Sequence, residues 1–423
     1  MSTIAVIGTG YVGLATGLGL AQLGHDVVCA DIDAGKVERL QSGDLPIHEE
    51  GMAELFADLV ASGRLRFVLG AANAIPGREF VFLAVPTPQD EDGSADMRHV
   101  VGAAEEIGPH LEPDAVVINK STVPVGSSTV VADALGRDDV SVASNPEFLR
   151  EGTALHDVQH PARIVVGAAD PDVAKRVAAL YDGIDAPLVL TDAASAEMVK
   201  YASNTFLAMK LSFVNSVAAL CESTGADVVD VLEGMGHDPR IGSEYLRPGP
   251  GWGGSCFPKD TRAMVRMSDD HDFDFVLLRR LLDQNDEQFE RVVSKVRRAV
   301  GGELRGTTVA VLGLAFKAGT DDTRDSPALA IVDRLVSAGA SVVAYDPIAR
   351  AEAPGLALAP DPYEACDGAD AVLVVTEWPE FAELDLDALA ARLRRPAMVD
   401  GRNMFDPSAA RAAGLDYQGL GRS

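Results

Sequence analysis

The sequence predicts an α/β protein in which two doubly wound parallel sheets are joined by a long central helix. Three observations predict this fold: a strand, glycine-rich turn and helix at residues 3–24, a long apolar helical stretch at 191–222, and a second alternation of strands and helices from Thr308. Such alternation favours parallel sheets covered by helices on both faces. We expect three segments, 1–190, 191–300 and 301–423, within the 423 residues.

The first segment opens with the pattern of a dinucleotide-binding turn. The strand Thr3 to Ile7 runs into Gly8-Thr9-Gly10-Tyr11-Val12-Gly13, a helical pattern follows, and the next strand, Val27 to Ala30, ends at Asp31. In a Rossmann fold these glycines allow a tight turn, admit a pyrophosphate to the helix N-terminus and let helix pack on strand. A carboxylate at Asp31 favours NAD over NADP, although the nearby Lys36 leaves NADP open. Residues 1–190 are therefore predicted to form an NAD-binding Rossmann domain.

Polar loops follow the later strands of this sheet. The predicted strands are Phe80 to Val85, Ala115 to Asn119 and Val140 to Ala143. Ligands of open α/β sheets lie beyond the carboxyl ends of the strands, so these loops are expected to line one crevice. Taken singly, Thr87 and Thr122 are compatible with ordinary helix caps, and Glu147 and Glu151 with ordinary first-turn acids. The convergence of three such loops favours a functional interpretation.

The middle segment begins with a long helix, predicted from Thr191 to Glu222. Its apolar residues cover more than one stripe, which is typical of a buried helix, so we expect an interdomain spine that also forms a subunit contact. Lys200 and Asn204 are four residues apart and share one face of this helix. A buried ammonium and amide aimed together would stabilise an oxyanion or bind a sugar. The alternative is a lysine that extends to solvent beside a surface amide.

The segment 191–300 also contains the stretch that we expect to carry the chemistry, Pro250-Gly251-Trp252-Gly253-Gly254-Ser255-Cys256-Phe257-Pro258-Lys259-Asp260. The glycines leave room around the backbone, and Lys259 places a cation three residues from Cys256. A nearby cation lowers the pKa of a thiol, which makes it a better nucleophile. From these residues alone an inert cysteine in a glycine turn is equally compatible. The irregular segment Asp238 to Pro248 leads into this loop.

The C-terminal segment repeats the strand and helix alternation without the full glycine fingerprint. Its predicted strands are Thr308 to Leu312, Ser341 to Tyr345, Ala371 to Thr376 and Ala397 to Asp400. We expect a second Rossmann-like sheet that binds a nucleotide in a different way or binds none. Lys317, Arg324 and Arg402 are basic loop residues suited to phosphates, although each alone is also compatible with a solvated charge.

Composition narrows the classes of function. The chain has 64 acidic against 36 basic residues and a net charge of -28, which argues against nucleic acid or an anionic membrane as partner. The other cysteines, Cys29, Cys221 and Cys366, lie in apolar or ordinary surroundings and, with Cys256, show neither metal-binding nor disulfide spacing. We expect no signal peptide and no apolar run of the length of a membrane span, and therefore a cytoplasmic protein without a metal.

Along essentially the whole chain the motifs resemble the UDP-glucose/GDP-mannose dehydrogenase family. The matching segments are Gly8 to Gly13, Val85-Pro86-Thr87-Pro88, Lys120-Ser121-Thr122-Val123-Pro124-Val125-Gly126, Asn145-Pro146-Glu147-Phe148-Leu149-Arg150-Glu151-Gly152, Lys200-Tyr201-Ala202-Ser203-Asn204-Thr205, Gly253 to Asp260 and Phe316-Lys317.

The resemblance implies an oxidoreductase that oxidises the C6 alcohol of a nucleotide sugar to a carboxylate with two NAD per sugar. Cys256 would capture the aldehyde as a thiohemiacetal, a second oxidation would give a thioester, and water would release the product. UDP-glucose is the expected substrate, because GDP-mannose relatives tend to have leucine at Phe257 and UDP-N-acetylmannosamine relatives depart from Lys259. The alternative is the same chemistry on another nucleotide sugar, a UDP-N-acetylhexosamine or GDP-mannose.

The resemblance also implies roles for individual residues. The catalytic set would be Cys256, Lys200, Asn204, Asp260, Glu151 and Thr122. NAD would contact Gly8, Gly10, Tyr11, Val12, Gly13, Asp31, Lys36, Thr87, Thr122, Glu151, Lys259 and Arg324. The UDP-sugar would contact Glu147, Phe148, Leu149, Arg150, Glu151, Lys200, Asn204, Arg240, Tyr245, Leu246, Arg247, Pro248, Gly249, Gly253, Phe316, Lys317 and Arg402. Arg240 would reach the site of a neighbouring subunit, which implies a homodimer.

Two other classes of function share part of this equipment. An NAD-dependent hydroxyacid dehydrogenase shares the first domain but needs one hydride transfer, no nucleophilic thiol and no second Rossmann-like domain. A non-catalytic NAD-binding sensor would keep the glycines and Asp31 but would not need Cys256, Lys200 and Asn204 together. The sequence therefore favours the nucleotide-sugar oxidoreductase.

Overall fold

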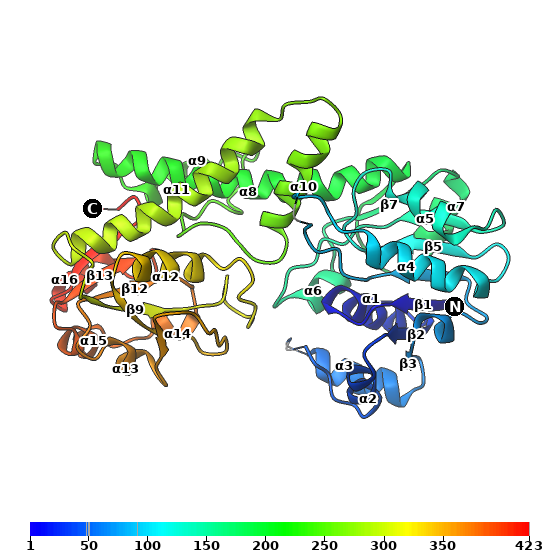
Figure 1. Ribbon diagram of the computed structural model, residues 1–423, viewed down its shortest axis with the longest axis horizontal. Coiled ribbons are helices and arrows are strands. Elements are labelled where there is room, and N and C mark those ends of the chain that lie inside the picture. Colours follow the sequence, from blue (N-terminus) through cyan, green and yellow to red (C-terminus); the bar gives the residue numbers. More distant parts are fainter. Residues whose placement is uncertain (48, 50, 91, 423) are drawn as a thin grey trace. The chain divides into compact units, whose positions relative to one another are not determined.

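The computed structural model describes residues 1–47, 49, 51–90 and 92–422 (Figure 1). The chain forms two compact units, Met1–Ser203 and Asn204–Ser423. The long helix α8 (Ala193–Thr224) begins in the first unit and ends in the second. The division of the sequence into three segments stays a prediction.

In the described part of the first unit the strands form one eight-stranded sheet of order β3-β2-β1-β4-β5-β6-β7-β8. The strands are β1 Thr3–Ile7, β2 Asp26–Asp31, β3 Leu65–Leu69, β4 Phe80–Leu83, β5 Val116–Asn119, β6 Ser141–Ser144, β7 Ile164–Ala168 and β8 Leu188–Thr191. Neighbouring strands are parallel except β6 and β7. The order reverses between β1 and β4, and an open sheet binds its ligand in the crevice at such a reversal.

Helices cover both faces of this sheet, because successive residues of a strand point to opposite sides. Ile4 and Val6 of β1 pack with α1 (Tyr11–Gln22), α3 (Met52–Ala61) and α7 (Pro171–Ala178). Ala5 and Ile7 pack on the other side with α4 (Arg98–Ile107) and α5 (Ser127–Leu135). The remaining helices of this unit are α2 Ala34–Gln41 and α6 Ala154–Gln159.

The described part of the second unit contains a six-stranded parallel sheet of order β11-β10-β9-β12-β13-β14. This is the Rossmann order, and the first six strands of the other sheet have it too. The strands are β9 Thr308–Leu312, β10 Ser341–Tyr345, β11 Leu356–Leu358, β12 Ala371–Val374, β13 Ala397–Asp400 and β14 Asp416–Gly419. The helices beyond α8 are α9 Val228–Gly236, α10 Phe257–Asp270, α11 Val276–Ala299, α12 Pro327–Ser337, α13 Pro362–Cys366, α14 Pro379–Ala382, α15 Leu386–Arg392 and α16 Pro407–Ala412. One core joins α11 and α12 to the sheet through Val292, Val296 and Ile331.

The predicted fold class, two Rossmann-like sheets and a long central helix, is confirmed. The structure adds β3, β7, β8, β11 and β14 and the antiparallel pairing of β6 with β7, which the sequence pattern did not predict. It also ends β4 at Leu83 instead of Val85, because the chain leaves the sheet ahead of Pro86. Proline cannot donate to a strand ladder.

Helix α8 is, by length and composition, apolar enough to cross a membrane, with a mean hydropathy of 1.2 over its best 18 residues. The expectation that no uninterrupted apolar run reaches such a length is not contradicted by this average, because serines, asparagines and lysines interrupt the apolar residues of α8. A core helix passes the same test. Lys200, Asn204 and Asn215 of α8 are buried with polar partners inside the protein, which is the arrangement of a core helix.

Candidate active site

Two glycines of the first turn are required by their surroundings. Gly8 has a φ of +99°, and a Cβ there would lie 2.4 Å from the carbonyl oxygen of Ala84. A Cβ on Gly13 would lie 1.9 Å from the carbonyl oxygen of Gly8, so only glycine lets α1 approach the turn this closely. Gly10, in contrast, has open space around its Cβ position at the exposed N-terminus of α1. Because the first backbone N–H groups of a helix attract phosphates, this geometry fits a dinucleotide pyrophosphate.

Asp31 stands at the carboxyl end of β2 beside this turn. Its Oδ2 accepts hydrogen bonds from the Thr9 backbone N–H at 2.9 Å and from Lys36 Nζ at 3.1 Å, and its Oδ1 accepts one from the Asp33 N–H at 3.1 Å. Burial on its own would raise the pKa of Asp31, but the hydrogen bonds from Thr9, Asp33 and Lys36 outweigh it and lower the pKa to about 2. The carboxylate is therefore ionised and able to accept ribose hydroxyls.

The second sheet has a carboxylate at the equivalent position, Asp346 after β10, but it is used differently. Asp346 is 1% exposed, and it accepts hydrogen bonds from the backbone N–H groups of Leu314 and Ala315 and from Trp378 Nε1 at 2.7–3.0 Å. Its second oxygen accepts from the N–H groups of Ile348 and Ala349. This carboxylate holds the loop after β9 and cannot bind a ribose, which agrees with the expectation that the second sheet binds a nucleotide in a different way or binds none.

The loops at the carboxyl ends of β4 and β5 are tied together. The Thr87 hydroxyl donates to the carbonyl oxygen of Thr122 at 2.9 Å, so Thr87 joins two loops and does not cap a helix. The Ser121 hydroxyl donates to the Val85 carbonyl oxygen at 2.6 Å. The two loops predicted to line the crevice are therefore one connected rim.

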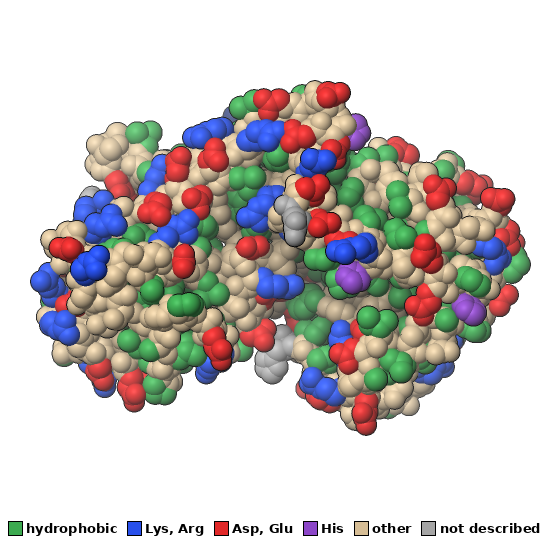
Figure 2. Space-filling model, in the orientation of Figure 1, with side chains coloured by type: hydrophobic (Ala, Val, Ile, Leu, Met, Phe, Trp, Pro, Cys, Tyr) green, Lys and Arg blue, Asp and Glu red, His purple; other side chains and the backbone are tan. Residues whose placement is uncertain are grey.

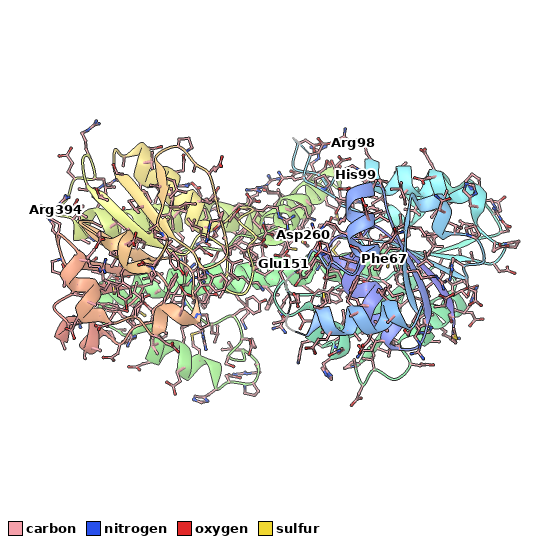
Figure 3. All side chains as sticks on the ribbon, turned by 90° about the horizontal axis from the view of Figure 1, so that it is seen from below. Phe67, Arg98, His99, Glu151, Asp260 and Arg394 are labelled. Carbon is pink, nitrogen blue, oxygen red and sulfur yellow. The ribbon has the colours of Figure 1, made fainter. Side chains whose placement is uncertain are left out.

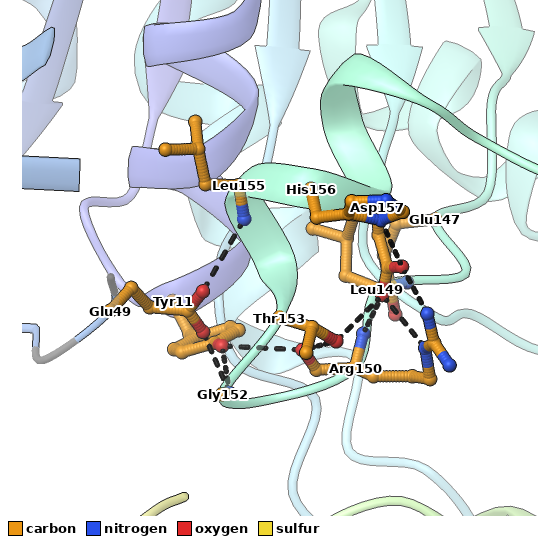
Figure 4. Close-up of polar contacts among 10 residues, drawn as sticks. All are labelled: Tyr11, Glu49, Glu147, Leu149, Arg150, Gly152, Thr153, Leu155, His156 and Asp157. Atoms are coloured by element: carbon orange, nitrogen blue, oxygen red, sulfur yellow. Dashed lines mark hydrogen bonds and ion pairs between the residues drawn. The ribbon is translucent and has the colours of Figure 1, made fainter. Parts of the chain in front are cut away.

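The loop after β6 is anchored to the glycine-turn helix (Figure 4). The Gly152 N–H donates to Tyr11 Oη and to Glu49 Oε1, both at 2.7 Å. The Arg150 guanidinium pairs with Asp157 of α6 at 2.6 Å. Glu151 lies between Arg150 and Gly152 in this loop (Figure 3). The anchoring fixes the backbone that carries Glu147 and Glu151.

Glu147 and Lys200 form a buried ion pair in the first unit. Lys200 Nζ donates to Glu147 Oε1 at 2.8 Å, and the Leu149 N–H donates to Oε2 at 2.6 Å. The two side chains are 7% and 5% exposed. Burial on its own would raise the pKa of Glu147, but the charges and hydrogen bonds around it, first of all from Lys200, lower it. Lys200 therefore does not extend to solvent, and Glu147 does not lie in the first turn of a helix.

Two more cations surround this pair, and sequence reasoning assigned them no role. Lys120 is buried, and its Nζ donates to Asn145 Oδ1 at 3.0 Å. Burial lowers the pKa of Lys120 to about 8, with the charge of Glu147 opposing the shift and that of Lys200 adding to it. The Arg163 guanidinium carbon lies 3.4 Å from the centroid of the Phe148 ring, and Lys200 Nζ lies 5.5 Å from it. Lys120 stands in a motif that the sequence shows, whereas Arg163 has no local signal.

In the second unit, Asn204 and Lys259 converge on Asp260. Asn204 Nδ2 donates to Asp260 Oδ2 and Lys259 Nζ donates to Oδ1, both at 2.6 Å. Asp260 is 1% exposed and is labelled in Figure 3. Asn204 is therefore a buried amide and not a surface one. The structure pairs Lys259 with Asp260, and the proposed effect of Lys259 on the thiol stays a prediction.

Cys256 occupies the N-cap position of α10, is half-buried, and lies 3.6 Å from the Ser255 hydroxyl. The N-terminus of a helix carries a partial positive charge, which favours a thiolate. Asp260 in the first turn of the same helix donates its backbone N–H to the Cys256 carbonyl oxygen at 2.8 Å. The thiol is thus held one helical turn from the Asn204–Asp260–Lys259 cluster.

Side-chain amides of α8 and α11 hold the loop that precedes Cys256. Asn285 bonds both backbone groups of Trp252 at 2.9 Å. The Gly249 N–H donates to Asn215 Oδ1, and its carbonyl oxygen accepts from Gln288 Nε2, both at 2.8 Å. We call Asn215, Asn285 and Gln288 the amide clamp. All three are buried, so the loop is fixed by groups far apart in the sequence.

Loops of the second sheet also contact the cysteine loop. A Cβ on Gly253 would lie 2.0 Å from the Asp325 carbonyl oxygen, and one on Gly254, whose φ is +84°, would lie 2.8 Å from the Phe316 ring. Arg402 donates from Nε to the Val375 carbonyl oxygen at 2.7 Å. Its Nη1 would lie 3.1 Å from a Cβ on Gly249. Gly249, Gly253, Phe316 and Arg402, all predicted substrate contacts, are thus brought together.

The remaining predicted residues of the second unit are near the same loop or on the surface. Tyr245 lies 6.3 Å from the Phe257 ring, between centroids, and Leu246 is buried. Lys317 Nζ lies 5.6 Å from the Phe316 ring centroid. Arg240 pairs with Asp238, and Arg324 with Asp322, both at 2.6 Å; Arg247 is exposed. In the part of the chain that the structure describes, His, Cys, Asp and Glu side chains form no group of three able to hold a metal ion.

Family comparisons cover most of the chain. Residues 2–185 match the NAD-binding domain of the UDP-glucose/GDP-mannose dehydrogenase family, residues 194–287 its central domain, and residues 310–407 its UDP-binding domain. The glycine turn and Asp31 therefore belong to an NAD-binding domain.

Individual relatives agree with these matches. The chain is 46% identical to a UDP-glucose 6-dehydrogenase of Rhizobium meliloti, with 99% of both chains covered, and 43% identical to one of Bacillus subtilis, with 99% and 97% covered. A UDP-glucose dehydrogenase structure from Pyrobaculum islandicum superimposes with a TM-score of 0.93 at 39% identity, covering 100% and 98% of the chains. A UDP-D-ManNAc dehydrogenase from Pyrococcus horikoshii gives 0.89 at 28% identity, covering 99% of both. The protein belongs to the UDP-glucose/GDP-mannose dehydrogenase family.

Proposed function

We propose that the protein oxidises C6 of the glucose in UDP-glucose to a carboxylate, in two successive oxidations. The observation that carries the proposal is the setting of Cys256, a half-buried thiol at the start of α10, one turn from the bonded cluster of Asn204, Lys259 and Asp260. An NAD-binding and a UDP-binding domain in one chain, and relatives that are UDP-glucose 6-dehydrogenases, support the choice of substrate. NAD, when bound, supplies the hydride acceptor for each oxidation.

The chemistry divides into four steps around one sulfur atom. First, C6 loses a hydride and its hydroxyl loses a proton, for which we assign Asp260 acting through a water molecule as base. The Cys256 thiolate then forms a C–S bond to the aldehyde, and the oxyanion takes up a proton to give a thiohemiacetal. Loss of a second hydride and of the hydroxyl proton leaves a thioester. Water attacks it, the C–S bond breaks, and the thiolate and UDP-glucuronate result.

Lys200 and Asn204 are assigned to the oxyanions that form in these steps. They lie one turn apart on α8, and each is already oriented by a buried carboxylate, Glu147 or Asp260. Loss of one such donor typically costs about 3 kcal/mol of transition-state stabilisation. We assign Glu151 to the hydrolytic water and Thr122 to its support.

Other residues bind the two ligands in this proposal. For NAD these are the residues of the glycine turn with Asp31, Lys36, Thr87, Thr122, Glu151, Lys259 and Arg324. For the UDP-sugar they are residues 147–151, Tyr245 to Gly249, Gly253, Phe316, Lys317 and Arg402, with Arg240 from a neighbouring subunit. The described residues include all four cysteines and form no disulfide, which supports the cytoplasm as the compartment.

The test is a screen of NADH production with UDP-glucose, UDP-N-acetylglucosamine and GDP-mannose. We expect two NADH for each UDP-glucose consumed and UDP-glucuronate as the product on chromatography, with kcat/KM for the other sugars lower by roughly a hundredfold. One NADH per sugar with release of an aldehyde would contradict the thioester route. A higher kcat/KM for either other sugar would contradict the substrate.

Replacing Asp31 by alanine should weaken NAD binding selectively. The change removes hydrogen bonds from the ribose to a charged group, worth about 1.5–3 kcal/mol, so the KM for NAD should rise on the order of tenfold to a hundredfold. The kcat at saturating NAD should stay within about threefold, because this interaction is made equally in the ground and transition states. Asp33→Ala is the matched control, since it removes only the cap of α2. An unchanged KM for NAD would exclude the assigned role of Asp31.

We also propose a homodimer formed through α8. Phe206, Phe213 and Leu220 recur every seven residues on this helix and are 56%, 55% and 62% exposed, an apolar stripe that a second copy would cover. Phe213→Glu should shift the protein from dimer to monomer in sedimentation velocity, because it places a charge in that interface. Ser223→Glu, at an exposed position of the same helix outside the stripe, is the control. A wild-type monomer at micromolar concentration would contradict the dimer.

A further inference from the structure

A pocket of about 390 Å³ lies between α8 and α11 in the second unit, apart from the residues proposed to bind NAD or UDP-sugar. This volume is within the range of small-molecule sites. Its lining residues are Asn215, Ala218, Ala219, Glu222, Gln288, Glu290, Arg291, Ser294, Lys295, Arg298 and Leu420. Figure 1 shows α11 crossing α8, and the ion pair of Lys295 with Glu222 at 2.7 Å joins the two helices directly.

The charges that line the pocket leave it positive. Lys295 and Glu222 pair at 2.7 Å and cancel, and Glu290 is paired with Arg334, outside the pocket, at 2.8 Å. Arg298 has no ion pair in the part of the chain that the structure describes. Arg291 has a long ion pair, 3.9 Å from Glu287, which neutralises its charge weakly. Acidic and basic side chains are interspersed on the face that Figure 2 shows. In a chain of net charge -28, a local excess of arginine favours an anion.

The wall of the pocket contains a buried acceptor. Gln288 is 4% exposed, its Nε2 donates to the Gly249 carbonyl oxygen, and its Oε1 has no hydrogen-bond partner among the described residues. A buried acceptor is costly to leave unmet, so a donor is expected to reach it from the pocket. An anion that also carries a hydroxyl group satisfies both Gln288 and the arginines.

We propose that this pocket binds a small hydroxylated anion of the class of sugar phosphates and sugar acids, and that its occupation acts on the cysteine loop. Gln288 and Asn215 line the pocket and also hold the two backbone groups of Gly249. Gly249 precedes Trp252, which Asn285 holds, and the chain then reaches Cys256. A ligand hydroxyl on Gln288 orders the amide that fixes this loop, so the bound anion changes the rate at which the thiol reacts. The binding site itself does not depend on the proposed function; the effect on turnover rests on it.

Isothermal titration calorimetry tests the binding. Saturating UDP is present in each titration to occupy the proposed substrate site. The probes are glucose 6-phosphate, glucuronate, glucose and inorganic phosphate. We expect glucose 6-phosphate or glucuronate to bind at least fivefold more tightly than glucose and inorganic phosphate, and whichever is tighter identifies the anionic group. Arg298→Gln should weaken this binding at least fivefold. Arg297→Gln, a neighbouring exposed arginine of α11 that does not line the pocket, should leave it within twofold.

Turnover tests the coupling. With UDP-glucose and NAD saturating, the tighter probe should change the rate of NADH formation at least twofold in the wild type and in Arg297→Gln, and leave Arg298→Gln unchanged. Equal binding to the wild type and Arg298→Gln, or binding matched by glucose and inorganic phosphate alone, would overturn the site. Binding that depends on Arg298 but leaves turnover unchanged in an active enzyme would overturn the coupling. An enzyme inactive on UDP-glucose but binding the probe would refute the proposed function and leave the site standing.

Discussion

Cys256→Ala should abolish the formation of UDP-glucuronate, with a fall in kcat of roughly a thousandfold or more. The variant lacks the only group proposed to hold the sugar between the two oxidations, so neither the thiohemiacetal nor the thioester forms. Binding of UDP-glucose and NAD should stay within about threefold, because the thiol sits at the edge of a loop whose backbone the amide clamp holds. Product chromatography measures the first effect and titration calorimetry the second.

Cys221→Ala provides the matched control for Cys256→Ala. Cys221 is a buried thiol of α8 in the apolar cluster with Val214 and Leu232. Its removal leaves a small cavity and lowers stability by about 1 kcal/mol, while the catalytic groups stay in place. We expect turnover within about twofold of the wild type. UDP-glucuronate formed by Cys256→Ala at more than a tenth of the wild-type rate would eliminate covalent catalysis by this residue.

Lys200→Met should reduce both activity and stability. The variant removes an oxyanion donor, which should lower kcat by roughly a hundredfold to a thousandfold. It also leaves the Glu147 carboxylate buried without its 2.8 Å partner, and breaking such a pair typically costs about 3–5 kcal/mol. The apparent melting temperature by circular dichroism should therefore fall by roughly 10 °C.

The double variant Lys200→Met, Glu147→Gln separates these two effects. Neutral glutamine removes the buried unpaired charge, so the melting temperature should return to within about 3 °C of the wild type. The activity should stay low, because the donor is still missing. A double variant that melts as low as Lys200→Met would show that the ion pair is not the source of the stability loss. A single variant with more than a tenth of wild-type kcat would rule out Lys200 as the main oxyanion donor.

Much of the fold follows from local signals. The strand, glycine turn and helix at residues 3–24 are predictable because Gly8 and Gly13 are each required by a contact within the same βα unit or with the chain next to it. The central helix is predictable from its length without proline or glycine. Strands β7 and β8 are not predictable from the sequence, because short apolar runs are compatible with either helix or strand. The antiparallel pairing of β6 with β7 depends on long-range contacts that no local pattern encodes.

The candidate site, like the fold, is predictable from the sequence only in part. Glu147, Lys200 and Asn204 stand in dense motifs, so their importance is predictable, but their burial and their partners are not. Arg163 immediately precedes β7, and its guanidinium lies over the Phe148 ring. No motif near Arg163 in the sequence indicates this contact. The amide clamp joins Asn215 to Asn285 and Gln288 on another helix. Asparagine and glutamine on helices are ordinary surface residues in sequence, and only tertiary packing gives these three their role.

The amide clamp has a consequence for how acidity affects the protein. Asn215, Asn285 and Gln288 carry no ionisable group, so the backbone ahead of Cys256 is held by bonds that neither mild acid nor mild alkali removes. A loop secured by carboxylates or histidines would loosen as those groups changed charge. We therefore expect the pH profile of turnover to contain no contribution from loosening of the loop ahead of Cys256.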